Sequence, residues 1–551
     1  MFWNIAENKK GWIEKQISEM TLDAKIGQLV CEISNTFMKI QNQSEWLCQY
    51  PIGSVFVGAE VIDDNTQKLA AVRKCVESIR DATRVPVLFC GDFENGIGQG
   101  IEGFTRLPDV MALGATHDPD LAYEYGRIIA EEAKTLNIHW AFGPVSDLNL
   151  NYLSPITNVR TIGDQPDHAV KMLGALVRGM QTQGVAACPK HFPGDGTDSR
   201  NQHLVTSLNL LSKAEWDRQH GKVFKSLIES GAAAIMIGHI GFPDWEPVDP
   251  VKQLFRPATT SKRIMTDLLR NELGFKGIIL TDALVMCGFT SWAKYEERIL
   301  DSFNGGTDIF LWPESEKFFP LMRSALRDGR ASMDRLEESV RRIMAFKAWL
   351  GLDEQKDTPV LSEAAINKNR RIAGTIAEKS LTMFRNRAGA IPLQLPPDAE
   401  LLMLITPGPY SEFAARAMKP LQIFKKELEK RGYRMTMRPL SEFGSITDIE
   451  KYECVFLICN ARPSYVDYTG FDYQIWSFMS CEKVRKRVML SFGTPYYLYE
   501  VASADTYLNF YSDCEDTQMA AVRALFGEIP FPGRSPVELK HCFDFGCGLS
   551  L

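Results

Sequence analysis

The chain lacks a surplus of basic charge. Its 62 lysines and arginines are outnumbered by 69 aspartates and glutamates, which gives a formal net charge of -7. A protein that binds phosphates through general electrostatics needs a broad positive field, and this composition does not supply one. We therefore expect neither nucleic acid nor a membrane surface as a partner.

Long apolar runs are also missing. The segment MFWNIAENKKGWIEKQISEM has no uninterrupted apolar core of the secretory type, and no later run is apolar enough to span a bilayer. The 12 cysteines are scattered without a C-x-x-C pair, and the spacing of the 8 histidines suggests no metal site. We expect a cytoplasmic protein with reduced thiols, no metal and no cofactor.

What the sequence does contain is a recurring pattern of short apolar runs. Each run ends in polar residues and is followed by a stretch with helical spacing. The runs cover residues 26–34, 53–59, 85–93, 138–147, 184–192, 232–240, 276–284 and 306–312. Strands that alternate with helices in this number predict an α/β fold, a (β/α)8 TIM barrel, over residues 1–349. Ser212 and Glu215 predict a capping box at the start of one of the intervening helices.

A chain of 551 residues is longer than one hydrophobic core normally accommodates, so a second domain is expected. Residues 350–374 predict a mainly polar linker. Beyond it, the runs ELLMLITPG, YECVFLICNA, RVMLSFGTPYY and DTYLNFYS have the character of buried strands between helices. They predict a C-terminal αβα sandwich over residues 375–551. A homodimer is compatible with these features.

Polar residues follow several of the predicted barrel strands. Because parallel strands in a closed barrel all end on one face, these side chains should converge on one pocket. They are Asp92, Asp147, Lys190, His191, His239 and Asp282. Asp282 ends the run GIILTD, which would hold its carboxylate rigidly as a nucleophile, although a helix cap or an ion pair with Lys190 would suit the same position. Asp92 has the same geometry and could equally bind hydroxyl groups of a ligand.

The segment KHFPGDGTDSRNQHL, residues 190–204, has the composition of a loop that reaches over a pocket. His203 in this loop could serve as general acid and base, or could be an ordinary surface residue. Lys190 could form a Schiff base if burial lowered its pKa. The neighbouring His191 and the carboxylates favour a protonated lysine instead.

At these residues the chain resembles glycoside hydrolase family 3, and particularly its β-N-acetylglucosaminidase branch. The segments that carry the likeness, in order, are GDFENGIGQGIEGFTRLP, MALGATHDPDLAYEYG, FGPVSDLN, NVRTIG, KHFPGDG and ILTDALVMCGF. The C-terminal part is similar to the αβα domain of the family through RVMLSFGTPYYLYEV and FGEIPFPGRSPVEL. The resemblance implies a retaining, exo-acting β-glycosidase, and most directly a β-N-acetylhexosaminidase that hydrolyses non-reducing-end β-linked sugars.

The resemblance also implies roles for individual residues. Asp282 would be the nucleophile that forms a glycosyl-enzyme intermediate, and His203 the acid/base in place of the second carboxylate that most retaining enzymes use. The residues that would grip the hydroxyls of a small carbohydrate substrate are Asp92, Arg160, Lys190 and His191. In other branches of the family the acid/base is a glutamate of the C-terminal domain, for which Glu412 and Glu515 are available.

Three positions depart from the pattern of the branch. Asn201 stands where the histidine normally has an aspartate partner, and an amide can fix the ring but cannot stabilise an imidazolium. We therefore expect Asp198 or Asp195 to take over as a modulator of His203. Asp195 itself replaces a histidine of KHFPGHG, and residues 98–100, GQG, replace a segment that usually carries an arginine.

Other readings of the sequence stay open. A β-glucosidase or β-xylosidase would use the same barrel with a different sugar preference. A glycoside phosphorylase is favoured slightly by Asn201, because a neutral group repels phosphate less than a carboxylate does. A sugar-binding protein with impaired catalysis is a further alternative, although Asp282 argues against it.

Overall fold

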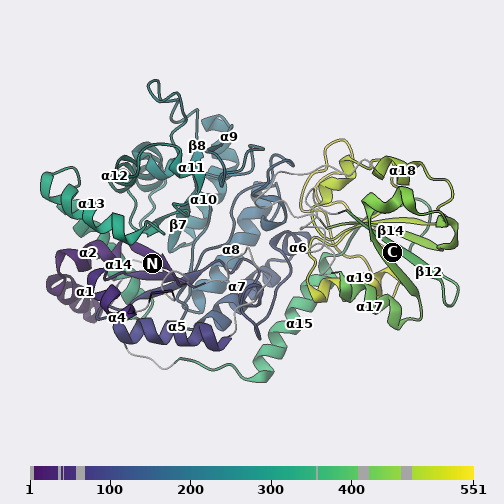
Figure 1. Ribbon diagram of the computed structural model, residues 1–551, viewed down its shortest axis with the longest axis horizontal. Coiled ribbons are helices and arrows are strands. Elements are labelled where there is room, and N and C mark those ends of the chain that lie inside the picture. Colours follow the sequence, from purple (N-terminus) through teal and green to yellow (C-terminus); the bar gives the residue numbers. More distant parts are fainter. Residues whose placement is uncertain are drawn as a thin grey trace.

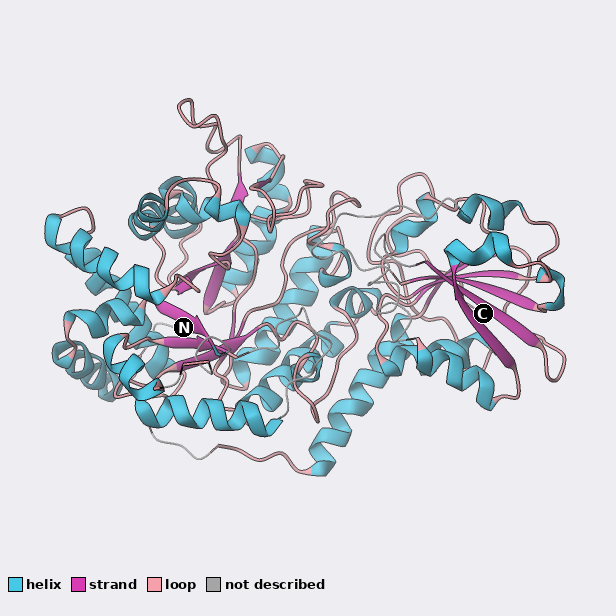
Figure 2. Cartoon of the chain, viewed as in Figure 1, coloured by secondary structure: helices cyan, strands magenta, loops and turns pink. Residues whose placement is uncertain are grey.

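The computed structural model of the chain describes residues 5–34, 39–40, 42–57, 69–354, 358–406, 421–460 and 474–550. In Figure 1 the N-terminal part, purple to teal, lies to one side of the C-terminal part, green to yellow. The two parts contain separate β-sheets (Figure 2). None of the described helices is long and apolar enough to cross a membrane.

The N-terminal part is a closed parallel barrel, which confirms the predicted fold class. Its strands are β1 (Val30–Ile33), β2 (Ser54–Phe56), β3 (Leu88–Gly91), β4 (Trp140–Ala141), β5 (Ala186–Ala187), β7 (Ala234–Ile237), β9 (Ile278–Thr281) and β10 (Phe310–Leu311). The hydrogen-bonded order β10-β1-β2-β3-β4-β5 forms most of the wall. The bridge between Phe192 and Ile237, the β7–β9 pair and the bridge between Leu280 and Ile309 close it.

Each of the eight apolar runs therefore contains one barrel strand, as the alternation of strand and helix patterns predicts. A short additional pair, β6 (Ser207–Leu208) and β8 (Ile240–Gly241), lies beside the barrel. The helices are α1 (Glu7–Glu19), α2 (Leu22–Gln28), α4 (Gln43–Gln49), α5 (Leu69–Ala82), α6 (Val110–Ala115), α7 (Pro119–Lys134), α8 (Pro166–Thr182), α9 (Lys213–Arg218), α10 (His220–Glu229), the π-helix η4 (Arg263–Glu272), α11 (Cys287–Thr290), α12 (Tyr295–Gly305), α13 (Ser315–Asp328) and α14 (Met333–Trp349). The predicted capping box of Ser212 and Glu215 opens α9.

The C-terminal part is a three-layer αβα sandwich. Its sheet has the order β11-β16-β15-β14-β12-β13, with β11 (Thr382–Asn386) antiparallel to its neighbour. The other strands are β12 (Glu400–Thr406), β13 (Arg434–Pro439), β14 (Cys454–Cys459), β15 (Arg487–Ser491) and β16 (Thr506–Asn509). Side chains alternate along β12, so Leu401 and Met403 join one core with α17 (Gln422–Lys430) and α19 (Glu515–Leu525). Leu402 and Leu404 join the opposite core, which includes Phe478 of α18 (Gln474–Ser480).

The two parts are joined by helix α15 (Glu363–Ser380), which crosses the end of the predicted linker and packs against α6, α7 and α19. The domain limits at 349 and 375 stay predictions. The segment between β3 and α6 is also tied to the C-terminal part. Arg106 pairs with Asp513 at 2.7 Å, and the Asp109 N–H donates to the Ser512 hydroxyl at 3.2 Å. The C-terminal domain therefore supports a segment that begins at the barrel mouth.

Asp308 fixes the register of β9, which presents Asp282. The carboxylate is buried and accepts hydrogen bonds from the Ile279 N–H at 3.0 Å and from Arg342 at 2.6 Å. Arg270 pairs with it at 2.5 Å. Although burial opposes its ionisation, the surrounding guanidinium groups hold the pKa of Asp308 well below its ordinary value. The charged form therefore contributes stability above the ordinary aspartate pKa, and this contribution is lost as the pH falls.

We predict that Asp308→Asn lowers the free energy of unfolding by about 3–5 kcal/mol, because it removes the charge of the buried carboxylate that the partly buried Arg270 and Arg342 share. Differential scanning calorimetry at pH 7 should show a lower midpoint for the transition of the barrel. The control is Asp81→Asn, which removes an exposed carboxylate paired with exposed Arg80. Equal midpoints for the two variants would refute the role of Asp308.

Candidate active site

Asp282 lies at the mouth of the barrel, directly after β9. Its N–H donates to the Ile237 carbonyl at 2.9 Å, and its Oδ1 accepts from the Ala283 N–H at 2.7 Å. Only 9% of the residue is exposed. Burial would raise the pKa of Asp282, but His191, His239, the Ala283 N–H and His203 together lower it. The result is a rigid, ionised carboxylate in a mostly buried position.

A second group of residues forms a charged network beside it. Lys190, buried after β5, contacts Asp92 Oδ1 at 2.7 Å and Glu94 Oε1 at 2.6 Å. Arg160 donates to both oxygens of Glu94, at 3.0 Å and 2.8 Å. Burial opposes the charge on each cation, yet the carboxylates raise the pKa of both Lys190 and Arg160. A lysine held protonated in this way is not available as a Schiff-base nucleophile.

His191 connects the nucleophile candidate to a third carboxylate. Its Nδ1 lies 2.7 Å from Asp147 Oδ2, and its Nε2 lies 3.8 Å from Asp282 Oδ2. Asp147 also accepts the backbone N–H groups of His191 and Asp195, at 3.1 Å and 2.7 Å. Because an ionised carboxylate only accepts hydrogen bonds, the Nδ1 atom of His191 carries the proton that is donated to Asp147. Asp147 thereby fixes the orientation of the ring that faces Asp282.

The long loop after β5 brings His203 to the same mouth. The His203 carbonyl accepts from the Cys287 N–H at 3.0 Å, and the Gln202 carbonyl accepts from the Gly288 N–H at 3.1 Å. A Cβ on Gly288 would lie 2.6 Å from the Gln202 carbonyl oxygen, so only glycine permits this approach. The loop is thus held against the segment that follows Asp282.

Asn201 orients the ring of His203. Its Oδ1 accepts from the His203 N–H at 2.9 Å and lies 2.8 Å from Nδ1. Because an amide oxygen only accepts, the Nδ1 atom carries the proton, and Nε2 is the nitrogen that can take up or release one. Burial lowers the pKa of His203 to about 4; Asp282 acts in the opposite direction, whereas Arg160, His191 and His239 lower it further. The histidine is neutral at pH 7.

Asp198 and Asp195 have other partners. Asp198 accepts from the Leu208 N–H at 2.9 Å and from Arg200 at 2.8 Å, which folds the base of the loop. Asp195 accepts from the Gly196 N–H at 2.7 Å, and burial raises its pKa to about 7. These contacts of Asp198 and Asp195 shape the loop, whereas Asn201 contacts the ring of His203.

The structure brings together two sets of predicted residues: Asp282, His191 and His203 in one, and Asp92, Lys190 and Arg160 in the other. Glu94, which joins the second set, was not singled out from the sequence. Its position two residues after Asp92, in GDFEN, was the available signal. Of the two alternative acid/base glutamates, Glu515 begins α19 and Glu412 lies outside the described residues. Within the described ranges no group of three or more histidine, cysteine or acidic residues could hold a metal ion.

Several known proteins resemble the chain in sequence and in fold. Residues 21–346 match the glycosyl hydrolase family 3 N-terminal domain. The chain is 30% identical to a beta-N-acetylglucosaminidase/beta-glucosidase of Cellulomonas fimi, over 96% of this chain and 95% of that protein. A solved structure of beta-glucoside phosphorylase BglX has a TM-score of 0.84 at 28% identity, and covers 97% of both chains. A family 3 beta-N-acetylglucosaminidase from Paenibacillus sp. str. FPU-7 has a TM-score of 0.82 at 25% identity, over 94% of this chain and 99% of that one.

The contact between Asn201 and His203 can be tested by titration. We predict that Asn201→Asp raises the pKa of His203 by about one to three pH units, because a carboxylate stabilises the imidazolium that an amide does not. Histidine NMR signals followed between pH 3 and 8 give the value, with His203→Gln to assign the resonance. Asn201→Ala supplies no negative charge and should not raise the pKa. An unchanged His203 titration in Asn201→Asp would contradict the pairing.

Proposed function

Since the chain belongs to glycoside hydrolase family 3, it is a retaining β-glycosidase, and we propose that it releases non-reducing-end β-linked N-acetylhexosamines with Asp282 as nucleophile and His203 as acid/base. The observation that carries this proposal is the placement of His203, with Nδ1 held by Asn201, on a loop pinned to the segment after Asp282. The names of the relatives support the sugar.

In the proposed first step, an Asp282 oxygen attacks the anomeric carbon while the glycosidic C–O bond breaks. Protonated His203 gives its Nε2 proton to the departing oxygen. In the second step His203 takes a proton from water, whose oxygen attacks the anomeric carbon and displaces Asp282. Two inversions return the original β configuration. With a pKa of about 4, His203 is already unprotonated at pH 7, which is the form that the second step needs, whereas the first step proceeds through the smaller protonated fraction.

The residues beside Asp282 are proposed to bind the terminal sugar. Asp92 and Lys190 offer a charged acceptor and a charged donor to its hydroxyl groups, and charged partners make the stronger hydrogen bonds. Arg160 and His191 complete this set. Glu94 keeps Lys190 and Arg160 in place, which limits the reorganisation needed when substrate binds.

We also propose that the enzyme works in the cytoplasm on small oligosaccharides. All 12 cysteines are free thiols, and several are fully buried. Unpaired thiols are typical of proteins in reducing compartments. Fractionation of the native cells would test this location directly.

Asp282→Ala should lower kcat for a 4-nitrophenyl β-glycoside by about 10⁴-fold or more, the scale on which removal of a nucleophile acts. Sodium azide should then restore turnover by occupying the vacated space. A single displacement inverts the anomeric carbon, so the product identified by NMR should be the α-glycosyl azide. The control is Asp217→Ala, which removes an exposed carboxylate. A β-azide product or full activity without azide would refute the assignment.

His203→Ala should affect substrates according to their leaving groups. We expect a loss of about 10²–10⁴-fold in kcat/KM for an unactivated disaccharide, which needs protonation, and a much smaller loss for a nitrophenyl glycoside. Azide attack on the glycosyl-enzyme should give the β-glycosyl azide. His541→Ala, a change at an exposed histidine, should leave kcat/KM unchanged for both substrates. Equal losses on both substrates would exclude His203 as the acid.

A phosphorylase is the second candidate. The neutral pair of Asn201 and His203 places no fixed negative charge beside the anomeric carbon once Asp282 is esterified, so a phosphate dianion meets less repulsion than it would beside a carboxylate. The likeness to beta-glucoside phosphorylase BglX supports the same reading.

Phosphate dependence separates the two activities. A hydrolase should turn over an aryl β-glycoside equally with and without inorganic phosphate and release the free sugar. A phosphorylase should turn over faster with phosphate and release the β-sugar 1-phosphate, detectable by ³¹P NMR. In Asn201→Asp, the added carboxylate should reduce the rate of any phosphate-dependent turnover. Hydrolysis should then account for a larger fraction of the total turnover.

A further inference from the structure

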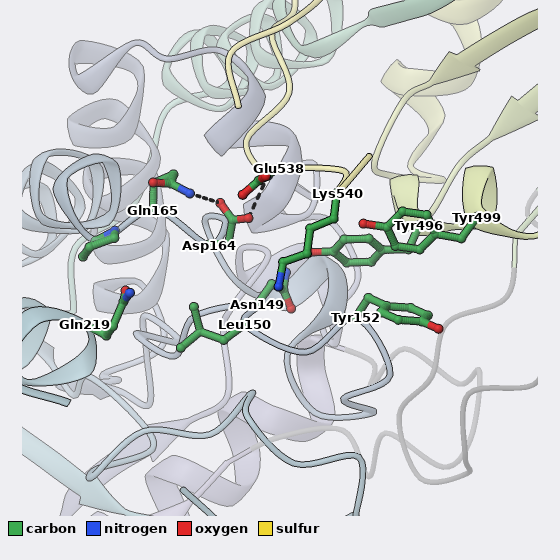
Figure 3. Close-up of a pocket in the computed structure, with 11 residues that line it drawn as sticks. Asn149, Leu150, Tyr152, Asp164, Gln165, Gln219, Tyr496, Tyr499, Glu538 and Lys540 are labelled. Atoms are coloured by element: carbon green, nitrogen blue, oxygen red, sulfur yellow. Dashed lines mark hydrogen bonds between the residues drawn. The ribbon is translucent and has the colours of Figure 1, made fainter. Parts of the chain in front are cut away.

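A cavity of about 240 Å³ lies between the barrel and the C-terminal domain, and none of the proposed catalytic or sugar-binding residues lines it (Figure 3). The barrel contributes residues of the segment between β4 and α8, among them Asn149 and Asp164. The C-terminal domain contributes Tyr496 and Tyr499 of the 3-10 helix η7 (Pro495–Tyr499), and Lys540. The same segment between β4 and α8 also carries Arg160, which belongs to the proposed sugar-binding residues.

One side of the cavity is aromatic. The rings of Tyr496 and Tyr499 are nearly parallel, with centroids 6.0 Å apart. Tyr152 of the barrel meets Tyr499 edge-on at 4.9 Å. In Figure 3 the three tyrosines lie together, across the cavity from Asp164, Gln165 and Gln219. Aromatic rings of this kind offer apolar faces to a ligand and polar hydroxyl groups at their edges.

The cavity also contains buried polar atoms that lack hydrogen-bond partners. Tyr496 is only 2% exposed, and its hydroxyl has no hydrogen-bond partner among the described residues. The same holds in the described structure for Oε1 of Gln219. Buried polar groups are almost always hydrogen-bonded, so two such atoms in residues that line one cavity point to a polar partner bound beside them.

The charges of the lining favour a neutral ligand. Asp164 and Glu538 contribute carboxyl groups and Lys540 one ammonium group, so neither an anion nor a cation meets a field of one sign. Asp164 already accepts from the Glu538 N–H at 2.8 Å, and burial raises its pKa to about 6. The volume is below the roughly 300–1,000 Å³ of sites for drug-sized ligands.

We propose that this cavity is a second carbohydrate site, which binds one neutral sugar ring against Tyr152 and Tyr499. The apolar face of the ring packs on the tyrosines. Its hydroxyl groups complete the hydrogen bonding of Tyr496 and Gln219. The site is independent of the catalytic assignment of Asp282 and His203.

Isothermal titration calorimetry on the full chain tests the proposal, with glucose and N-acetylglucosamine as probes. Asp92→Ala weakens the proposed catalytic sugar site and isolates the second one. This variant should still bind one of the two sugars. Adding Tyr152→Ala, at a residue that is already 36% exposed, should weaken that binding about tenfold or more. Tyr496→Phe removes one hydroxyl and should weaken it as well.

Trp476→Ala, a change at an exposed aromatic residue of the C-terminal domain, is the control and should leave the affinity unchanged. Tyr152→Ala alone should leave turnover at the catalytic site unchanged. No binding of either sugar to Asp92→Ala would overturn the proposal, as would affinity that neither tyrosine change affects. Binding of inorganic phosphate that disappears in Lys540→Ala would instead identify an anion site and refute the neutral ligand.

Discussion

The carboxylate of Glu94 is shared by two cations, and the geometry of the barrel mouth depends on this sharing. Arg160 and Lys190 come from the segments after β4 and β5, and Glu94 from the segment after β3. Lys190 is buried, and a buried charge without its counterion costs several kcal/mol. The network therefore holds three neighbouring segments in one arrangement. The contact of Arg106 with Asp513 extends that support to the C-terminal domain.

Charge also distinguishes the two sides of Asp282. On one side His191 is oriented by the carboxylate of Asp147. On the other side His203 is oriented by the amide of Asn201. An amide fixes the tautomer of a histidine as a carboxylate does, but adds no negative charge. Burial lowers the pKa of His203 and the amide at position 201 does not oppose this, so His203 is neutral at pH 7. The ring is then in the form that acts as a base, and there is less negative charge around the sugar.

The sequence predicted the architecture well because the barrel strands are apolar and alternate regularly with helices. Strands β11 and β13 were not predicted: β11 pairs antiparallel at one edge, and β13 is an edge strand whose residues are partly exposed, so neither has the apolar pattern of a buried parallel strand. The site residues that follow barrel strands could be predicted from the sequence, because all parallel strands of a barrel end on the same face. Glu94 was missed because its importance lies in its partners, which come from distant parts of the sequence. The orientation of Asp198 toward Leu208 and Arg200 likewise depends on the folded loop.

The central claim is that Asp282 becomes covalently attached to the sugar. The most direct measurement is mass spectrometry of the intact protein and of its peptides after incubation with a fluorosugar fluoride, whose fluorine slows release of the sugar while the fluoride leaves readily. We predict that one fluorosugar residue is added per chain, on the peptide that contains Asp282, and that Asp282→Asn acquires none. A label on any other residue, or continued turnover of this reagent by Asp282→Asn, would contradict it.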